Sequence, residues 1–355
     1  MAQGFASPPA AVQGKGAVPV AAAVQSRATG QTRGRFPHRR AYAALDLGTN
    51  NCRMLIARPD GPGFFIVDAF SRIVRLGEGL GASGRLSDIA MDRAVAALSI
   101  CADKLVRRNV HIARSVATEA CRRANNGVEF ADRVMRETGI RLDIIDAEEE
   151  ARLAVMGCHT LLEQGSGPAL VFDIGGGSTE LVVVDTSGPE PRTLEWLSVP
   201  WGVVSLAEAE RHDQKLLGDR LAAYERMQDR VRESFGNFGE SHLRKGTLRM
   251  LGTSGTVTTL ASVHLDLPSY DRRLVDGLIV PARAMRGISD KLSKLSVTER
   301  AGLACIGQER ADLVVAGCAI LEAILDIWPA PRVGVADRGI REGILRQLMA
   351  SDVHP

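Results

Sequence analysis

The sequence predicts an α/β protein built from two similar lobes with mixed sheets and a cleft between them. Three observations support this fold class. A strand–turn–strand segment occurs twice, at Asp46–Ala57 and at Asp173–Val184, and the two copies align without a gap. Each copy continues into alternating helical and strand patterns, the order expected of sheets covered by helices. The Gly-containing stretch Gln164–Pro168 lies just before the second copy and marks the boundary between the halves.

The length of 355 residues favours two domains. We assign residues 1–40 to a disordered basic tail, 41–166 to an N-terminal lobe and 167–338 to a C-terminal lobe, and we expect a closing helix at 340–350 to pack on the N-terminal lobe. The tail contains six basic residues, no acidic residue and no helical or strand periodicity. It therefore buries too little apolar surface to offset the entropy cost of ordering.

In the first half, apolar and β-branched runs between Gly, Asn and Asp breaks predict an antiparallel meander of three strands. These strands are Tyr42–Asp46, Arg53–Arg58 and Phe64–Arg75. Ser87 can cap a helix that runs to Arg108, because apolar residues recur behind it at helical spacing. The next elements are a strand at Ile112–Thr118, a helix at Val128–Glu137, a strand at Leu142–Ile145 and a helix at Ala147–Leu162.

The second half repeats this order with additional helices. Three strands are predicted at Ala169–Asp173, Leu181–Asp185 and Thr193–Val199, followed by helices near 202–211 and 214–235. A strand at Leu248–Leu251 leads into a helix at Val257–His264. Ser296 and Glu299 have the spacing of a capping box. The last elements are a helix at Arg310–Ile327, a strand at Arg332–Val335 and a helix at Ile340–Met349.

Composition narrows the functional classes. No apolar run approaches the ~18 residues that a membrane-spanning helix needs. The six Cys residues show neither a CxxC pair nor zinc-ligand spacing, so we read them as buried, reduced thiols. Outside the tail the net charge is −4, since the whole chain carries +2. We expect a cytoplasmic monomer or homodimer with neither a membrane nor a nucleic acid as its partner.

The second copy of the repeated segment is the strongest indication of chemistry. Gly175, Gly176 and Gly177 would allow positive φ angles and bring backbone N–H groups close to an anion, and Ser178 and Thr179 add hydroxyl donors. Asp173 ends the preceding strand, where its carboxylate could hold Mg²⁺ beside phosphate oxygens. A plain glycine hairpin is the alternative, and the existence of a matching first copy disfavours it.

The first copy has the residues Gly48, Thr49, Asn50 and Asn51 in its turn and Asp46 before it. With one glycine in place of three, it offers fewer closely approachable amides. Arg53 follows and is a natural phosphate ligand, although a solvated surface arginine fits its position equally well.

Two further loops each follow a short strand and open a helix, where N–H groups favour anions. In the loop at 117–123, Arg122 is placed to bind a phosphate with two nitrogen atoms. The other loop consists of Gly252, Thr253, Ser254, Gly255 and Thr256, for which an ordinary helix cap is the alternative. Glu148, Glu149 and Glu150 begin another helix, and their spacing does not show which of them has a chemical role.

Taken together, these segments resemble the exopolyphosphatase/guanosine pentaphosphate phosphohydrolase (Ppx/GppA) family of the actin-like (ribonuclease H-like) ATPase superfamily. The matching segments lie in family order and cover nearly all of the chain outside the tail. They are Ala43–Asn50, Val116–Arg122, Glu149–Leu153, Phe172–Leu181, Glu309–Asp312 and Ile340–Leu345. Sugar kinases and actin share the Asp-x-Gly turns, but they lack the Glu-Glu-Ala-Arg-Leu helix.

The resemblance implies hydrolysis of a terminal phosphate by water in a cleft between two actin-like lobes. Glu150, directly before Ala-Arg, would be the base that activates the water. Asp173 and Glu180, assisted by Asp46, would hold Mg²⁺, while both turns and Arg122 would bind phosphates. The implied substrate is inorganic polyphosphate, with the conversion of pppGpp to ppGpp as the close alternative. A non-catalytic (p)ppGpp-binding sensor would keep the turns but would not need Glu150.

The chain also departs from the family pattern. Relatives often have Ser-Asn-Ser in the first turn, where this chain has Thr-Asn-Asn followed by Cys52 and Arg53, so the resemblance assigns Arg53 no role. Longer members continue into a helical HD-type domain and a further module. We expect this chain to be a short two-domain form with limited processivity on long polyphosphate.

Overall fold

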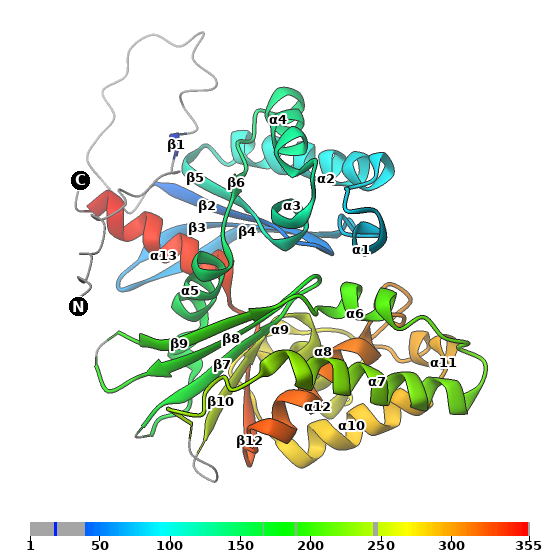
Figure 1. Ribbon diagram of the computed structural model, residues 1–355. Helices are drawn as coiled ribbons and strands as arrows, with labels where there is room; N and C mark the ends of the chain where they lie inside the picture. Colours follow the sequence, from blue (N-terminus) through cyan, green and yellow to red (C-terminus); the bar gives the residue numbers. More distant parts are fainter. Residues whose placement is uncertain (1–17, 20–39, 166, 189, 244–247, 354–355) are drawn as a thin grey trace, which may run out of the picture.

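The computed structural model describes residues 18–19, 40–165, 167–188, 190–243 and 248–353, which form two α/β lobes, each built on a six-stranded sheet (Figure 1). The two-residue strand β1 (Val18–Pro19) pairs with β5, and the remainder of the predicted basic tail up to residue 39 lies outside the described residues. No helix within the described ranges is both long and apolar enough to cross a membrane.

The first sheet has the strand order β1-β5-β2-β3-β4, with β6 beside β5. Its longer strands are β2 (Ala41–Leu47), β3 (Asn51–Asp60), β4 (Gly63–Ile73) and β5 (Val110–Ala117), and β6 is Asp143–Ile144. Strands β2, β3 and β4 form the predicted antiparallel meander, and β5 runs parallel to β2. The meander sets the β2–β3 turn at one end of the sheet.

Both faces of the first sheet are buried, which explains why β2 is apolar throughout. Ala43 and Leu45 belong to the core under helix α2, whereas the alternate residues Tyr42 and Ala44 pack with helix α13. The helices of this lobe are α1 (Leu80–Ser83), α2 (Asp88–Arg107), α3 (Glu119–Arg123) and α4 (Gly127–Thr138), together with the closing helix α13 (Ile340–Val353). Ser87 caps α2 as predicted, accepting a hydrogen bond from Ala90 N.

The second sheet has the order β11-β12-β10-β7-β8-β9. Its strands are β7 (Ala169–Ile174), β8 (Thr179–Asp185), β9 (Arg192–Val199), β10 (Arg249–Thr253), β11 (Ile279–Pro281) and β12 (Arg332–Ala336). As in the first sheet, three antiparallel strands are extended by a parallel strand, because β10 runs parallel to β7. This repeated topology confirms the predicted fold class of two α/β lobes with mixed sheets.

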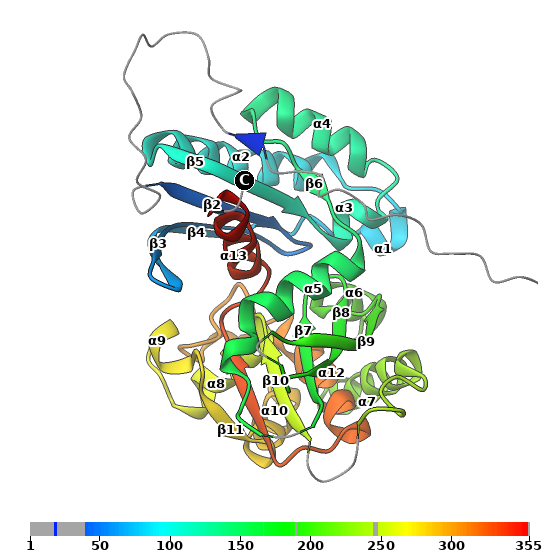
Figure 2. The same cartoon turned by 90° about the vertical axis from the view of Figure 1, so that its left-hand side faces the viewer.

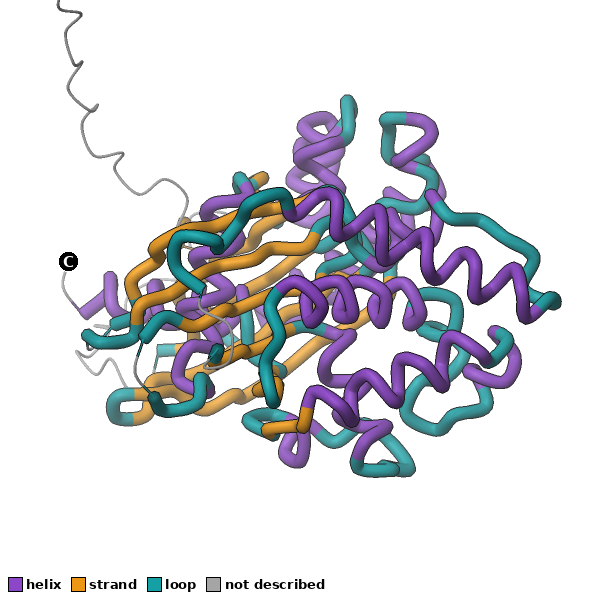
Figure 3. The backbone as a smooth tube through the Cα atoms, turned by 60° about the horizontal axis from the view of Figure 1, so that its bottom comes forward, coloured by secondary structure: helices purple, strands orange, loops and turns teal. Residues whose placement is uncertain are grey.

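Most helices of the second lobe gather on one side of its strands (Figure 3). They are α6 (Val203–Ala209), α7 (Leu217–Phe235), α8 (Gly255–His264), α9 (Arg272–Val275), α10 (Ala282–Lys294), α11 (Val297–Ala301) and α12 (Val314–Ile327). Helix α12 begins at Val314 rather than at the predicted Arg310, because turns occupy the residues before it. Helix α10 was not predicted, since Ser289 and Ser293 on its buried face interrupt the apolar pattern.

Helix α5 (Ala147–Cys158) lies between the two sheets and crosses α13 (Figures 1 and 2). Ala151 and Val155 pack on the second sheet, and Leu153 packs with the first. Glycines permit the crossing: a Cβ on Gly157 would lie 1.9 Å from Gly339 O, and one on Gly343 would lie 2.1 Å from Leu153 O. Contacts with both lobes therefore fix the first turn of α5, which faces the cleft.

Candidate active site

The β2–β3 and β7–β8 turns have the same internal geometry. In the first, Gly48 N donates to Asn51 O at 2.9 Å, and in the second, Gly175 N donates to Ser178 O at 3.0 Å. The strand register pairs Asp46 with Arg53 in one lobe and Asp173 with Glu180 in the other. The repeat therefore places an arginine in the first lobe where the second lobe has a carboxylate.

The carbonyl groups of the second turn are bound from behind by helix α6. Val203 N and Val204 N donate to Gly175 O and Gly176 O at 3.0 and 2.8 Å. Ser205 Oγ donates to Gly177 O at 3.0 Å. Within the described residues, the amides of Gly176 and Gly177 have no acceptor. The turn therefore presents N–H groups to the cleft while its oxygens are held away, which is the arrangement of a backbone anion site.

The first turn is bound in the same way by the segment after β4. Val74 N and Arg75 N both donate to Asn50 O, and Gly77 N donates to Thr49 O at 2.9 Å. The amides of Thr49 and Asn50 donate to no acceptor in the described part of the chain. Each lobe thus supplies one turn with free amides.

The prediction that the three glycines of the second turn adopt positive φ angles was wrong. None of Gly175, Gly176 and Gly177 has a positive φ angle. Glycine is required by close approach instead, because the two turns meet: a Cβ on Gly176 would lie 3.0 Å from Asn50 N, and one on Gly177 would lie 2.6 Å from Thr49 Oγ1. The second turn therefore fits directly against the first.

A cavity of about 80 Å³ lies between the turns. Its lining contains most of the predicted site residues: Asp46, Gly48, Thr49, Asn50, Asn51, Arg53, Glu150, Asp173, Gly175, Gly176, Gly177, Ser178, Thr253 and Ser254. Gly255 lines an adjoining hollow of about 70 Å³. We call the first of these the reaction cavity.

Four predicted residues lie outside both linings: Arg122, Thr179, Glu180 and Gly252. The Thr179 hydroxyl donates to Trp201 O at 2.7 Å and thereby fixes the end of β9. Gly252 is inside the sheet, where a Cβ would lie 2.4 Å from the Phe172 ring. Gly252 therefore serves packing rather than phosphate binding.

The three consecutive glutamates at the start of α5 lie in different surroundings. Glu148 is exposed, and Glu149 forms ion pairs with Arg114 at 2.9 Å and Arg152 at 2.7 Å. Glu150 is buried and lines the reaction cavity. The Asp146 carboxylate caps the helix by accepting from Glu149 N at 2.8 Å, which sets this first turn. Of the three, only Glu150 is placed to act on a molecule in the cavity.

Arg122, predicted as a phosphate ligand, instead holds Glu150. Its Nη1 lies 3.0 Å from Glu150 Oε2 and donates to Ile145 O at 2.8 Å, and its Nη2 donates to Glu119 at 2.7 Å. Glu150 Oε1 accepts no hydrogen bond from any described residue. One carboxylate oxygen is thus fixed, and the other is available to a molecule in the cavity.

Carboxyl groups crowd this end of the cleft, and their pKa values rise accordingly. Burial, followed by the charge of Glu180, raises the pKa of Glu150 well above its usual range. Burial also raises the pKa of Asp173 to about 6 and that of Glu180 to about 7, in each case partly through a neighbouring carboxylate. Burial is also the largest cause of the raised pKa of Asp46. A divalent cation would neutralise this concentration of carboxylates.

Two carboxylates of the reaction cavity are available as ligands for Mg²⁺. Asp46 Oδ1 is buried without a partner, and Asp46 and Asp173 both line the reaction cavity. The Glu180 carboxylate lies behind the turn, accepting from Ser178 and Ser198 at 2.6 and 2.9 Å. No three His, Cys, Asp or Glu side chains of the described residues form a metal site by themselves. One or two carboxylates plus substrate oxygens and water are the usual ligands of Mg²⁺.

These pKa shifts predict how stability depends on pH. Between about pH 4, where unfolded carboxyl groups titrate, and the folded values of about 6 and 7, the folded state binds more protons. Ionisation of this cluster therefore lowers the free energy of unfolding as pH rises through that window. We expect Mg²⁺ to raise the melting temperature more at pH 8 than at pH 5, measured by thermal denaturation. If Mg²⁺ raised the melting temperature equally at pH 5 and pH 8, or equally in wild type and Glu180→Gln, the carboxylate cluster would not be the cause.

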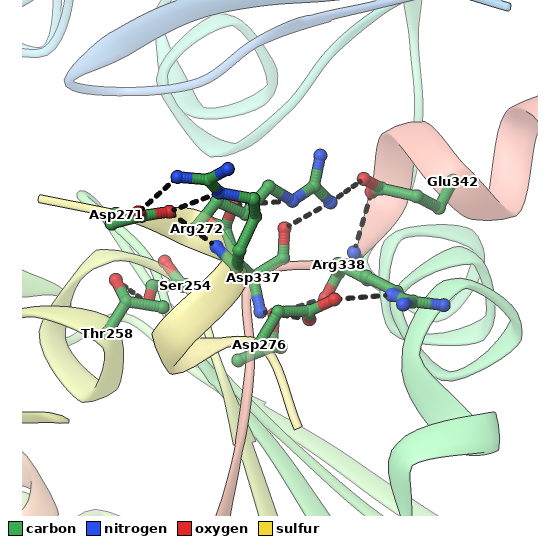
Figure 4. A network of polar contacts seen from close by, with 11 residues as sticks. Ser254, Thr258, Asp271, Arg272, Asp276, Asp337, Arg338 and Glu342 are labelled. Carbon is green, nitrogen blue, oxygen red and sulfur yellow. Dashed lines mark hydrogen bonds and ion pairs between the residues drawn. The ribbon is translucent and has the colours of Figure 1, made fainter. Parts of the chain in front are cut away.

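Sequence reasoning missed the connection between β12 and α13, which contributes Asp337, Arg338, Gly339, Ile340 and Arg341 to the reaction cavity. Figure 4 shows how ion pairs fix this connection. Arg272 bridges Asp337 and Glu342 at 2.9 and 2.7 Å, and Arg338 pairs with Asp276 at 2.8 Å. Arg341 lies within the matched segment Ile340–Leu345, a signal that could have identified it.

Arg341 and Arg53 are the cations of the cavity that are free to bind an anion. Neither forms a hydrogen bond or ion pair with a described residue. Burial lowers the pKa of Arg341, and the charge of Arg53 contributes in the same direction. Two guanidinium groups without carboxylate partners in one cavity indicate an anionic ligand.

Ser254 is a strained residue at the cavity. It has φ 84° and ψ −175°, a region that is favourable for glycine only and costs other residues roughly 1–3 kcal/mol. Its hydroxyl donates to Ile174 O at 2.9 Å, and its proximity lowers the pKa of Asp173 against the larger effect of burial. The strained conformation thus holds a hydroxyl beside a candidate metal ligand.

The chain is similar to known proteins in sequence and in fold. The sequence model of the Ppx/GppA phosphatase family matches residues 55–352. A Haemophilus influenzae protein named "Putative exopolyphosphatase" is 31% identical over 317 residues, which cover 87% of this chain and 91% of that protein. The crystal structure of an exopolyphosphatase-like protein, 28% identical, superposes with a TM-score of 0.78 and covers 88% of this chain and 98% of its own. An Aquifex aeolicus member of the Ppx/GppA family, 27% identical, gives a TM-score of 0.71 over 89% of this chain and 99% of its own.

Proposed function

Because the chain belongs to the Ppx/GppA phosphatase family, we propose that it is an exopolyphosphatase, which releases orthophosphate from the ends of inorganic polyphosphate. The observation that carries this proposal is the pair of facing turns with free amides, beside a buried glutamate that has one free oxygen. The turns suit the oxygens of a phosphate chain end, and the glutamate suits a water molecule next to it.

In the proposed reaction, a water oxygen attacks the terminal phosphorus, and Glu150 Oε1 accepts the proton from that water. The bond from phosphorus to the bridging oxygen breaks, so the products are orthophosphate and a chain shorter by one unit. Arg122 acts as a positioning residue, because it holds the other oxygen of Glu150. The raised pKa of Glu150 makes it a stronger base than an exposed carboxylate once it is ionised.

Phosphoryl transfer depends mainly on positioning and on neutralising charge. The amides of Thr49, Asn50, Gly176 and Gly177 would bind the non-bridging oxygens. Arg53 and Arg341 would neutralise charge on the phosphates. When bound through Asp46 and Asp173, Mg²⁺ would supply additional positive charge to the phosphate oxygens.

Asp173→Asn is expected to raise the Mg²⁺ concentration needed for half-maximal phosphate release, because a neutral amide is a poorer Mg²⁺ ligand than a carboxylate. The measurement is a Mg²⁺ titration of the initial rate. Glu149→Gln removes the same charge from a side chain paired with Arg114 outside the cavity, and it serves as the control. An identical titration for Asp173→Asn and wild type would remove Asp173 from the metal site.

A second candidate substrate is pppGpp, which would be hydrolysed to ppGpp. The reaction cavity of about 80 Å³ would hold a terminal phosphate, which polyphosphate and pppGpp both have. The deciding experiment compares phosphate release from long polyphosphate, short polyphosphate, pppGpp and ATP, with and without Mg²⁺. Faster turnover of polyphosphate supports the proposal, whereas a clear preference for pppGpp selects the alternative. Tight binding of (p)ppGpp without hydrolysis of any substrate would indicate a sensor.

A further inference from the structure

A second and larger cavity, of about 410 Å³, lies beside the reaction cavity. We call it the distal pocket and define it by Arg75, Arg211, His212, Arg220, Arg300 and Asp312, which are among its lining residues. Its lining residues come from the first lobe, mainly from the segment after β4, and from helices α6, α7, α10, α11 and α12 and the adjoining turns of the second. Asn50 lines the distal pocket, the reaction cavity and the hollow between them, so all three meet at the first turn.

Arg300 is the unusual residue of the distal pocket. It is only 2% exposed, yet no carboxylate of the described residues lies within ion-pair distance of it. Its Nη2 donates to Gln214 Oε1 at 3.2 Å, and its Nε is buried without a partner. Burying a charged group costs free energy unless it is paired and hydrogen-bonded. An unpaired, buried guanidinium on a cavity wall therefore indicates an anion that binds there.

Two further arginines extend this positive surface. Arg220 donates to the carbonyls of Gln214, Lys215 and Lys294, but its buried Nε has no partner and it forms no ion pair with a described residue. Arg211 is exposed and likewise makes no polar contact within the described chain.

Most acidic residues of the lining are already neutralised. Glu210 pairs with Arg226 and Arg230, and Asp312 pairs with Arg75 at 3.0 Å. Glu78 pairs with Arg93, while Glu208 accepts from Gly79 N and has no cationic partner. Three arginines without carboxylate partners thus face one free carboxylate, and the distal pocket is positive.

We propose that the distal pocket is a second anion site, which binds a phosphate group through Arg300 and Arg220. Two sources share this chemistry. One is an internal phosphate of a long polyphosphate whose end occupies the reaction cavity, and this source rests on the proposed function. The other is a separate phosphate-bearing molecule. The planar guanidinium fork of Arg300 favours a phosphate oxygen pair over a single-atom anion.

The test uses Arg300→Met, which keeps an unbranched side chain but removes the charge, and Arg283→Met as the control. Arg283 is an exposed arginine of α10 without a polar contact in the described chain. Binding of inorganic orthophosphate is measured by calorimetric titration of the full chain. We expect wild type and Arg283→Met to bind at two sites and Arg300→Met at one, or with roughly tenfold weaker affinity at the second.

A kinetic arm separates the two sources. If the pocket holds substrate, Arg300→Met raises the KM for long polyphosphate roughly tenfold more than the KM for inorganic triphosphate. If it holds a separate molecule, one phosphate site disappears while the ratio of the two KM values stays the same. Equal phosphate binding by wild type and Arg300→Met overturns the proposal. If no substrate is hydrolysed at all, the proposed function fails, and the titration still decides on the site. Should Arg300→Met not fold, Arg300→Gln is read in the same way, because it also removes the charge and keeps a polar, unbranched side chain.

Discussion

Glu150→Gln is expected to lower the rate of phosphate release by roughly 10²–10⁴-fold, the usual contribution of a positioned general base. The substitution keeps the shape of the side chain, and its amide oxygen can still accept from Arg122. It also removes a charge from a cluster in which burial, followed by the charges of Glu180 and Asp173, raises the pKa of Glu150. The melting temperature should therefore stay the same or rise while the activity falls. Initial rates on polyphosphate and thermal denaturation measure the two quantities.

Glu149→Gln is the matched control for this change. It removes the same charge from the adjacent residue, but Glu149 is bound to Arg114 and Arg152 rather than facing the cavity. Its rate should remain within a few-fold of wild type. If Glu150→Gln kept more than about a third of the wild-type rate, Glu150 would not be the base.

The features predictable from the sequence are those that repeat. The two Asp-containing turns and their flanking strands share apolar runs interrupted by small polar residues, so local chemistry alone predicts two strand–turn–strand units. The structure finds them in contact, with Gly177 against Thr49. The register pairs of Asp46 with Arg53 and of Asp173 with Glu180 follow from the same repeat.

The contacts that could not be predicted join residues far apart in the chain. Arg122 resembles a phosphate ligand in sequence, because nothing local shows that it pairs with Glu150, 28 residues further along the chain. Arg341 becomes a cavity residue only because the last helix returns to the first lobe and brings its first turn to the cleft. Both cases depend on tertiary packing, which local periodicity does not encode.

The position of the candidate base also depends on both lobes. Helix α5 carries Glu150 in its first turn, packs on the second sheet through Val155 and contacts α13 at Gly157 and Gly343. The reaction cavity is lined by the turns of both lobes. A shift of one lobe relative to the other would therefore change the distance from Glu150 to one turn more than to the other.

The second large effect is expected from Gly202→Ala, which adds a single methyl group behind the β7–β8 turn. Gly202 precedes α6 and has an ordinary extended backbone, so Gly202→Ala meets no conformational strain. Its new Cβ, however, would lie 2.4 Å from Gly176 C and 2.6 Å from Gly177 N. Backbone atoms cannot rotate away, so the turn itself must move toward the cleft. A displacement of about 1 Å can cost roughly 10²-fold in rate, and we expect a loss of that order in phosphate release.

Gly218→Ala is the control, because a Cβ at Gly218 meets no atom within 4 Å. It should leave the rate on polyphosphate close to that of wild type. Overpacking at Gly202 is expected to lower stability by about 1–3 kcal/mol, so rates are compared at a temperature where denaturation curves show both variants folded. A Gly202→Ala protein with a normal rate would mean that the turn tolerates displacement. In that case the amides of Gly176 and Gly177 would not be the groups that hold the reacting phosphate, because their contact geometry would have changed without a change in rate.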